Sequence, residues 1–416
     1  MAYSKQTWAD SPATTSPLSA ARLNHIEDGI FEAVPQNPSR TMTLPYSNGG
    51  LGGTVATTLA AGTAGSYRFV VKLPVTTTQW RIKLRNQEYT AGTKTAATLK
   101  KLIVGKHARA TTGTAGETGN FLGNTATTIV STDQTIPGNG TWYTSPWVTA
   151  AGDQFTADTE HLIGIGYTFA ASTSLQTSCG RSWFWTNSTS GTDPTIAGSG
   201  GTQQYVPFDW VIEYQCTTRR KVALVIGDSI SEGITGTNSA LQSTSLWHNP
   251  FWLWAARSDR LIVNLSLAGV GLVHYATSPA TNYLWTRQDI NSGAYTIDEI
   301  IISAGSNDFN TSRTLAQMQA DVLTIVSYLT TTLGLTAPIY MATLLARGTT
   351  GDAVRLTYHD WLAEVPTFAQ AEVIDFDGAT RGTSTTAIWP QYESDSIHPS
   401  RLGTMRMATE LHATLG

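Results

Sequence analysis

Residues 222–231 read VALVIGDSIS. The first five are apolar, which predicts a buried strand, and Gly227, Asp228 and Ser229 then favour a turn. A buried strand fixes the backbone, while the loop after it exposes side chains at the carboxyl edge of a sheet. Open α/β folds usually bind their ligands at that edge. The stretch therefore places the Ser229 hydroxyl where such a fold usually carries its chemistry.

A serine hydroxyl is a weak nucleophile, so it needs a general base and a group that orients this base. Residues 395–399 read DSIHP, near the other end of the chain. Asp395 and His398 can lie side by side in one turn, so that one ring nitrogen binds the carboxylate and the other faces Ser229. Three other histidines are alternatives, but none has an aspartate three residues before it: His248, His274 and His359.

Attack on an ester carbonyl also needs donors for the oxyanion that forms. After the predicted strand 261–264, Gly269 and Gly271 both allow close backbone approach, because glycine has no β-carbon. After the predicted strand 300–302, residues 304–308 read AGSND and offer the side-chain amide of Asn307. The candidate donors therefore follow successive strands.

Four motifs together resemble the four sequence blocks of the SGNH (GDSL-like) hydrolases: Gly227-Asp228-Ser229, Gly269, Gly305-Ser306-Asn307-Asp308 and Asp395-Ser396-Ile397-His398. The resemblance covers residues 218–416. It implies a flavodoxin-like three-layer α/β/α domain with Ser229 as nucleophile, His398 as base and Asp395 as its orienter. It further implies an oxyanion hole of the Ser229 amide, the Gly269 amide and the Asn307 side chain. Gly269 is preferred to Gly271 because it stands five residues after Asn264, and Asp228 is a candidate substrate contact.

Each motif alone has a simpler interpretation. A Gly-Asp-Ser triplet is most often a turn, Asn307 or Asp308 could merely cap a helix, and Asp395 with His398 could be a surface turn. The sequence contains no Gly-x-Ser-x-Gly elbow, no phosphate-binding Gly-x-x-x-x-Gly-Lys and no His-Glu-x-x-His. With only Cys179 and Cys216, a cysteine zinc site is excluded. No cofactor is implied.

Composition excludes several classes of protein. The 416 residues are enough for two or three domains, and the 13% of charged residues and the net charge of -4 do not indicate binding to nucleic acid. No apolar run approaches the length of a membrane span, and the amino terminus is polar and does not read as a secretion signal. Cys179 and Cys216 could pair, although reduced cysteines are the preferred interpretation.

Residues 1–40 have a distinct pattern. Leu23, Ile26, Ile30 and Ala33 form an apolar stripe at helical spacing, which predicts a short amphipathic helix that needs a partner surface. Residues 17–30 also resemble the amino-terminal attachment segments of bacteriophage tail and baseplate proteins; an ordinary packing helix is the alternative. The resemblance implies other tail or baseplate proteins as partners, and with the stripe it suggests a homotrimer. It places the protein in the virion, made in the host cytoplasm without a signal peptide.

Residues 41–217 are rich in Thr, Gly, Ser and Val, with short strand-like runs at 67–72, 79–84 and 161–166. Turn clusters such as residues 137–140 separate them, which predicts an antiparallel β-sandwich, jelly-roll-like, with a possible carbohydrate-binding role. Residues 125–135 could be strand or loop. Most of the thirteen tryptophans are expected in the core, and a minority could contact sugars: Trp183, Trp185, Trp247 or Trp252.

Residues 218–416 alternate strand and helix, as a doubly wound domain requires. We expect helices at 312–333, 352–365 and 400–415, and strands at 338–341 and 372–374. The predicted function is a cofactor-free serine esterase that removes acetyl or other short acyl groups from bacterial surface polysaccharide. The alternatives are a lipase with long-chain substrates and a tail receptor-binding protein with a vestigial site.

Overall fold

The fold is known from a computed structural model. It describes residues 39–42, 57–62, 64–86, 95–108, 119–177, 182–185, 205–206, 208–217, 220–233, 249–258, 260–286, 289–290, 296–348, 351–364, 366, 368–369, 372–383 and 386–416. The helix predicted from the stripe between Leu23 and Ala33 lies outside these residues, as do Cys179 and Trp247. Among the described helices, none combines the length and the apolar character that crossing a membrane requires.

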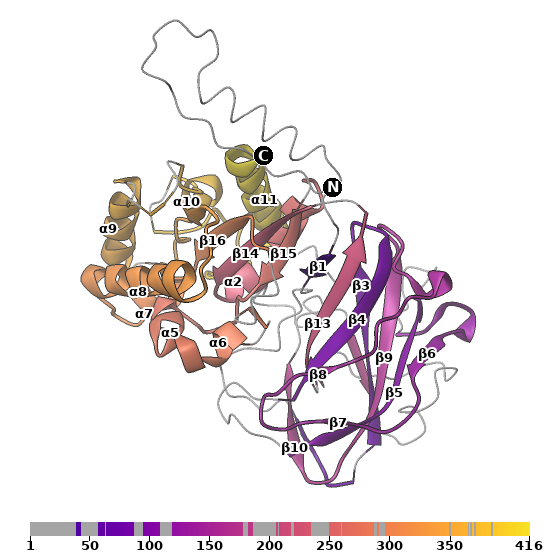
Figure 1. Cartoon of the computed structure of the whole chain (residues 1–416). Coiled ribbons are helices and arrows are strands. Elements are labelled where there is room, and N and C mark those ends of the chain that lie inside the picture. The colour runs from indigo at the N-terminus through magenta and orange to yellow at the C-terminus, as the bar shows by residue number, and fades with distance from the viewer. Residues whose placement is uncertain are drawn as a thin grey trace, which may run out of the picture.

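A parallel four-stranded sheet forms the centre of the carboxyl-terminal half (Figure 1). Its order is β15 (Arg260–Asn264), β14 (Lys221–Gly227), β16 (Glu299–Ser303) and β17 (Ile339–Met341). β14 is buried from Val222 to Gly227, because both faces of the sheet are covered. A strand that is apolar without alternation is typical of this position.

Helices cover the two faces of this sheet. Leu224 and Ile226 of β14 belong to a core cluster with residues of α5 (Leu272–Ala276), α8 (Leu315–Ser327) and α9 (Asp352–Ala363). The intervening Val225 belongs to a second cluster, with α4 (Pro250–Ala255), α10 (Phe376–Thr380) and α11 (Arg401–Leu415). The alternation of side chains along a strand thus divides the core in two. The result is the expected α/β/α arrangement, with α8 and α11 on opposite sides of the sheet (Figure 1).

The shorter helical elements of this half lie mostly at the ends of strands and helices. They are α2 (Ser229–Glu232), η4 (Pro279–Thr281), α6 (Tyr283–Thr286), α7 (Ser306–Asn310) and a π-helical turn, η6 (Tyr328–Thr332). The predicted helix at 312–333 is therefore divided into α8 and η6. The strand expected at 372–374 is wrong: the structure has only an isolated parallel bridge between Ile374 and Ala342 there. The Ile374 amide donates to the Met341 carbonyl at 3.0 Å and the Ile374 carbonyl accepts from the Thr343 amide at 2.9 Å, which is the pairing of a single bridge.

The described residues before 218 form antiparallel sheets. One sheet has the order β1 (Ser39–Met42), β13 (Asp209–Cys216), β4 (Thr77–Arg85), β8 (Tyr143–Thr144). A second has the order β11 (Ser182–Trp185), β3 (Ala64–Lys72), β9 (Glu160–Phe169), β5 (Ala97–Lys106), β6 (Thr127–Val130), and β7 (Gln134–Ile136) also pairs with β5. A small sheet joins β12 (Tyr205–Val206), β10 (Thr173–Thr177) and β2 (Thr57–Leu59), and two short 3₁₀ helices are η1 (Leu122–Asn124) and η2 (Ala151–Asp153). The runs predicted at 67–72, 79–84 and 161–166 lie within β3, β4 and β9.

Aromatic side chains fill the space between the two larger sheets. Phe69 of β3 stacks on Trp210 of β13 with ring centroids 4.1 Å apart, and the two strands belong to different sheets. Trp183 is also buried and packs beside the ring of His107. Trp183 belongs to a smaller buried cluster with Val70 and Phe121, separate from the one that contains Phe69 and Trp210, and is not exposed for sugar binding. Residues 125–135, left open between strand and loop, contain β6 and the start of β7.

The antiparallel and parallel halves share a polar contact. The hydroxyl of Tyr283, on α6, donates to the carboxylate of Asp209 on β13 at 3.0 Å. The same carboxylate accepts from the buried guanidinium of Arg85 at 2.6 Å. Lys83 on β4 forms an ion pair with Asp289. These bonds connect the two sheet systems across their boundary.

Candidate active site

Three loops meet at one edge of the parallel sheet. Gly227, the last residue of β14, is in register with Ser303 of β16, and Val225 is in register with Asn264 of β15. Because parallel strands end at the same edge, the segments that follow them lie close together. The sequence motifs at 228–229, 269–271 and 305–308 all occupy these segments.

Ser229 is the first residue of the short helix α2. Asp228 precedes it as N-cap, and its side chain accepts a hydrogen bond from the Ile230 amide at 3.0 Å. Gly233 ends the helix with φ +95°, a conformation that favours glycine. A β-carbon on Gly227 would lie 2.4 Å from the side chain of Ser231, so the motif needs glycine there for space. The backbone around Ser229 is thereby tightly fixed.

His398 connects Ser229 to Asp395. Its Nε2 lies 2.9 Å from the Ser229 Oγ, and its Nδ1 lies 2.8 Å from Oδ2 of Asp395. The His398 side chain is 14% exposed and that of Asp395 is 21% exposed. A hydroxyl, an imidazole and a carboxylate in this order can activate a serine for attack on a carbonyl carbon.

Asp395 is fixed by the backbone as well as by the imidazole. Its Oδ1 accepts from the amides of His398 at 2.7 Å and Ile397 at 3.1 Å. Partial burial works to raise the pKa of Asp395, but the hydrogen bonds to the imidazole and to these amides outweigh it, and the net pKa is lowered. The carboxylate therefore stays ionised at weakly acidic pH, where it can hold the ring of His398.

Asp228 is fully buried directly before Ser229. Burial raises the pKa of Asp228 to about 6, although the Ile230 amide and the nearby Arg347 favour its charged form. The carboxyl is therefore part of the support beneath the serine and does not face solvent, which argues against the predicted substrate contact.

The structure distinguishes between the two candidate glycines. Gly269 is exposed, has φ +79° and lies in a turn in which the Val270 amide donates to the Leu267 carbonyl. The Gly271 amide instead donates to Nδ1 of His274 at 2.9 Å. A β-carbon on Gly271 would lie 2.1 Å from Oδ2 of Asp308. The amide of Gly271 therefore already has an acceptor. Position 271 needs a glycine because a β-carbon would collide with Asp308.

Asn307 is half-buried in α7 and reaches back to the preceding loop. Its Nδ2 donates to the carbonyl of Val270 at 2.7 Å. An amide nitrogen carries two hydrogens, so one of them remains available for another acceptor. The bond brings the side chain of Asn307 next to the Gly269 turn.

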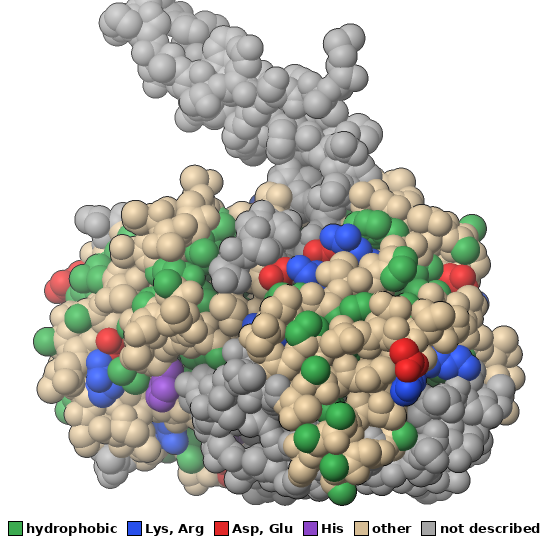
Figure 2. Space-filling model, turned by 60° about the horizontal axis from the view of Figure 1, so that its bottom comes forward, with side chains coloured by type: hydrophobic (Ala, Val, Ile, Leu, Met, Phe, Trp, Pro, Cys, Tyr) green, Lys and Arg blue, Asp and Glu red, His purple; other side chains and the backbone are tan. Residues whose placement is uncertain are grey.

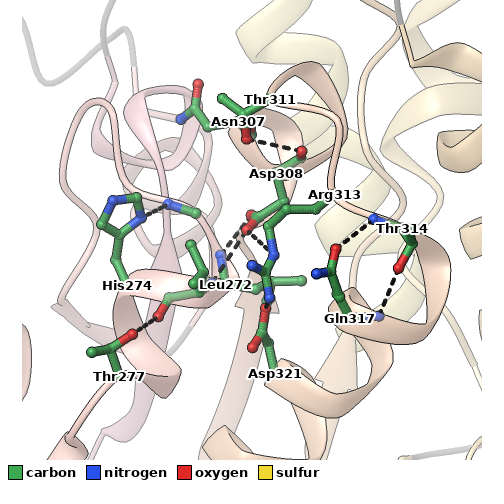
Figure 3. Close-up of polar contacts among 12 residues, drawn as sticks. Leu272, His274, Thr277, Asn307, Asp308, Thr311, Arg313, Thr314, Gln317 and Asp321 are labelled. Atoms are coloured by element: carbon green, nitrogen blue, oxygen red, sulfur yellow. Dashed lines mark hydrogen bonds and ion pairs between the residues drawn. The ribbon is translucent and has the colours of Figure 1, made fainter.

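Asp308, the residue after Asn307 in α7, connects this helix to the start of α5 (Figure 3). Its Oδ2 accepts from the Leu272 amide at 2.6 Å and its Oδ1 from the Val273 amide at 3.2 Å. These are first-turn amides of α5, which have no partner within their own helix. Arg313 lies beside the carboxylate and also pairs with Asp321. Asp308 therefore holds the glycine loop against α7.

Two further side chains support the site and were not predicted from the sequence. Glu232, buried in α2, accepts from the Ala268 amide at 2.5 Å and so connects the serine helix to the glycine turn. Arg347, after β17, donates to Oδ1 of Asn307 at 3.0 Å. A signal existed for both: Glu232 directly follows the serine motif, and Arg347 follows the fourth strand at the same sheet edge.

The other candidates are placed away from this hydrogen-bonded chain or lie outside the described residues. Trp252 on α4 is half-buried and packs against the larger core cluster. Trp247, His248 and the side chain of Trp185 are not among the described residues. His359 accepts from the Leu344 amide at 2.9 Å, and burial lowers its pKa to about 4. Among the described residues, no group of three His, Cys, Asp or Glu side chains could hold a metal ion.

Comparison with known proteins identifies a family for this part of the chain. Residues 225–406 match the model of the GDSL-like Lipase/Acylhydrolase family, as the four motifs predict. None of the curated protein sequences matches the chain significantly.

Several solved structures are similar at low identity. A family two carbohydrate esterase from Cellvibrio japonicus has 14% identity and a TM-score of 0.38, over 90% of this chain and 96% of that one. One from Clostridium thermocellum in complex with cellohexaose has 13% identity and a TM-score of 0.38, over 89% and 96%. The psychrotrophic esterase EstA from Pseudoalteromonas sp. has 16% identity and a TM-score of 0.34, over 47% and 96%. At these values, no substrate is inferred from them.

Proposed function

We propose that this ester-hydrolysing enzyme, whose residues 225–406 form a GDSL-like hydrolase domain, is a serine esterase that acts on short acyl groups of bacterial surface polysaccharide. The observation that carries the proposal is the continuous hydrogen-bonded chain from Ser229 through His398 to Asp395. Each of its bonds has the length that proton transfer or orientation requires. In this proposal Ser229 is the nucleophile, His398 the general base and Asp395 its orienter.

The reaction follows from this order of groups. His398 Nε2 takes the proton of Ser229 as Oγ attacks the ester carbonyl, and the imidazolium then gives that proton to the leaving alcohol. The C–O bond to the alcohol breaks and an acyl-serine remains. His398 then takes a proton from water as the water attacks the acyl-serine, and the imidazolium returns that proton to Ser229 Oγ as the acyl–Oγ bond breaks and the acid is released. The scheme uses only water as co-reactant.

Three donors are proposed for the oxyanion: the amides of Ser229 and Gly269 and Nδ2 of Asn307. Ser229 is the first residue of α2, where amides have no carbonyl partner within the helix. The Gly269 amide is at the exposed corner of its turn. The Asn307–Val270 bond brings the third donor beside that turn. Removal of one such donor typically costs about 10²- to 10³-fold in kcat.

The substrate and the setting rest on the amino-terminal sequence. Residues 17–30 resemble attachment segments of phage tail and baseplate proteins, and a tail-borne esterase meets acetylated polysaccharide on the bacterial surface. The antiparallel sheets, proposed as a jelly-roll-like sandwich, would help to hold the glycan. In this proposal the protein is a homotrimer in the virion and is attached to other tail proteins. On the face shown in Figure 2, described acidic and basic side chains lie interspersed, without a continuous basic surface for nucleic acid.

The test is hydrolysis of p-nitrophenyl esters from acetate to palmitate, beside acetate release from O-acetylated bacterial polysaccharide. Wild type, Ser229→Ala and Ser231→Ala are compared, because Ser231 is a buried serine that bonds to Ser303. We expect activity on acetate and butyrate that only Ser229→Ala abolishes. Preference for palmitate would replace the polysaccharide with lipid as substrate. Full activity of Ser229→Ala would refute the serine mechanism.

A further inference from the structure

Arg347 contacts the proposed oxyanion hole although it belongs to none of the four sequence motifs. It lies in the loop after β17, at the same sheet edge as the loops of Ser229 and Asn307. One guanidinium nitrogen, Nη1, lies 3.0 Å from the Ser306 carbonyl, 3.1 Å from the Ser306 hydroxyl and 3.0 Å from Oδ1 of Asn307, so its two hydrogens are shared among three acceptors. Arg347 therefore binds the first two residues of α7 together.

The contacts on the two sides of the Asn307 amide specify its orientation. Oδ1 accepts from Arg347, and Nδ2 donates to the Val270 carbonyl at 2.7 Å. A flipped amide would place its NH2 group against the guanidinium and its oxygen against a carbonyl, and both contacts would be repulsive. The second hydrogen of Nδ2 is therefore held in one direction, away from both partners.

The charge of Arg347 is retained in this position. Its side chain is half-buried, and burial lowers the pKa of Arg347 from its usual value while the nearby carboxylates of Asp228 and Asp395 raise it. A guanidinium stays protonated through such a shift. A cation bonded to Oδ1 polarises the amide and makes its N–H a stronger donor.

We infer that Arg347 is a positioning residue of the oxyanion hole: it fixes and polarises the amide of Asn307 so that one N–H faces the oxygen of the tetrahedral intermediate. The inference rests on the proposed function of Ser229 and Asn307. Arg347 then stabilises the transition state through Asn307 and does not contact the substrate. Loss of Arg347 then lowers kcat, while KM stays nearly constant.

A double-mutant cycle tests this coupling, with p-nitrophenyl acetate as substrate. The variants are Arg347→Met, Asn307→Ala and the double variant, beside Arg381→Met as matched control. Arg381 is a partly exposed arginine that pairs with Asp377. We expect Arg347→Met to lower kcat by about 10- to 100-fold with KM changed by less than about threefold. In the Asn307→Ala background the same substitution should lower kcat by less than about threefold, because the amide that Arg347 positions is already absent.

Two outcomes would overturn the inference. If Arg347→Met lowers kcat by the same factor with and without Asn307→Ala, Arg347 acts independently of Asn307. A change in KM alone would make it a substrate-binding group. If Arg347→Met does not fold, Arg347→Lys serves in the same cycle, since it keeps the charge but loses the planar fork. Full activity of Ser229→Ala would instead refute the proposed function itself, so the two failures are distinguishable.

Discussion

His398 Nε2 and Ser229 Oγ lie 2.9 Å apart, although 169 positions separate them in the sequence. Ser229 is held by the end of the first parallel strand, and His398 by the segment that leads into α11. In that segment the Ser394 amide donates to the His398 carbonyl at 2.9 Å, and Ser400 caps α11 through the Gly403 amide. Helix α11 packs on α4 within the second core cluster. The contact between the two side chains therefore depends on the packing of the whole carboxyl-terminal half.

Asp395→Asn tests the orienting role of the carboxylate. The amide can still accept from the Ile397 and His398 amides, but its NH2 group cannot accept the imidazole N–H and favours the wrong tautomer. We expect kcat to fall about 10³- to 10⁴-fold with an unchanged circular dichroism spectrum. Glu393→Gln, in the same segment, is the control that should keep its activity. A loss of less than about tenfold would remove Asp395 from the mechanism.

Gly271→Ala tests the close packing of the glycine loop on Asp308. The added β-carbon would meet Oδ2 of Asp308 at 2.1 Å, so the bonds to the Leu272 and Val273 amides would have to give way. The expected loss is about 1–3 kcal/mol in the free energy of unfolding, with a lower kcat. Gly152→Ala is the control, because a β-carbon there meets nothing within 4 Å. Equal stability of the two variants in urea would contradict this account.

Glu232→Ala tests the bond between the serine helix and the glycine turn. Without the carboxylate, the half-buried Ala268 amide loses its charged acceptor, and a hydrogen bond to a charged group typically contributes about 1.5–3 kcal/mol. The turn that carries the Gly269 amide would then shift, and kcat should fall more than KM rises. Glu232→Gln retains an acceptor oxygen and should recover most of the loss. Thermal unfolding and acetate-ester kinetics of both variants measure the effect, and a Gln variant as poor as Ala would count against the bond.

The raised pKa of Asp228 predicts that the stability of the protein depends on pH. Burial raises the pKa of Asp228 in the folded state to about 6, above the value of about 4 in an unfolded chain. Between these values the folded state binds more protons, so its free energy of unfolding falls as the pH rises from about 4 to about 6. Relative to wild type, Asp228→Asn should gain stability across this interval, by at most about 3 kcal/mol.

Urea unfolding at pH 4 and pH 7 measures this difference. Asn keeps an oxygen for the Ile230 amide, so the N-cap is retained in the variant. Asp133→Asn, at an exposed ion pair with Lys100, is the control and should show no such gain. The same stability difference between Asp228→Asn and wild type at both pH values would mean that Asp228 titrates normally.

The sequence predicted the elements whose signal is local. The apolar run at 222–227 is β14, and the stripe beginning at Leu315 is α8, because periodicity alone reveals a buried strand or an amphipathic helix. The triplet around Ser229 and the Asp395–His398 pair could be identified because four short motifs occur together, in the order of the family's sequence blocks. Residues 225–406, which contain all four motifs, match the model of the expected family.

What the sequence could not give depends on tertiary contacts. Arg347 acts on Asn307 from 40 residues away, and Glu232 bonds to Ala268 from 36 residues away. Their positions after the serine motif and after the fourth strand place them near the sheet edge, but no local pattern shows which partner each side chain binds. The two glycines were likewise separable only by their partners, His274 and Asp308 for Gly271. The end of α8 in a π-helical turn also had no local signal.

The most direct test of the central claim is covalent labelling with a p-nitrophenyl phosphonate ester, followed by peptide mass spectrometry. A nucleophilic serine attacks phosphorus, expels p-nitrophenolate and keeps the phosphonyl group. Wild type should gain one adduct on Ser229 and lose esterase activity in proportion. Ser229→Ala should gain none, and His398→Ala should react far more slowly. An adduct on another residue, or full activity with Ser229 blocked, would contradict the assignment of Ser229 as nucleophile.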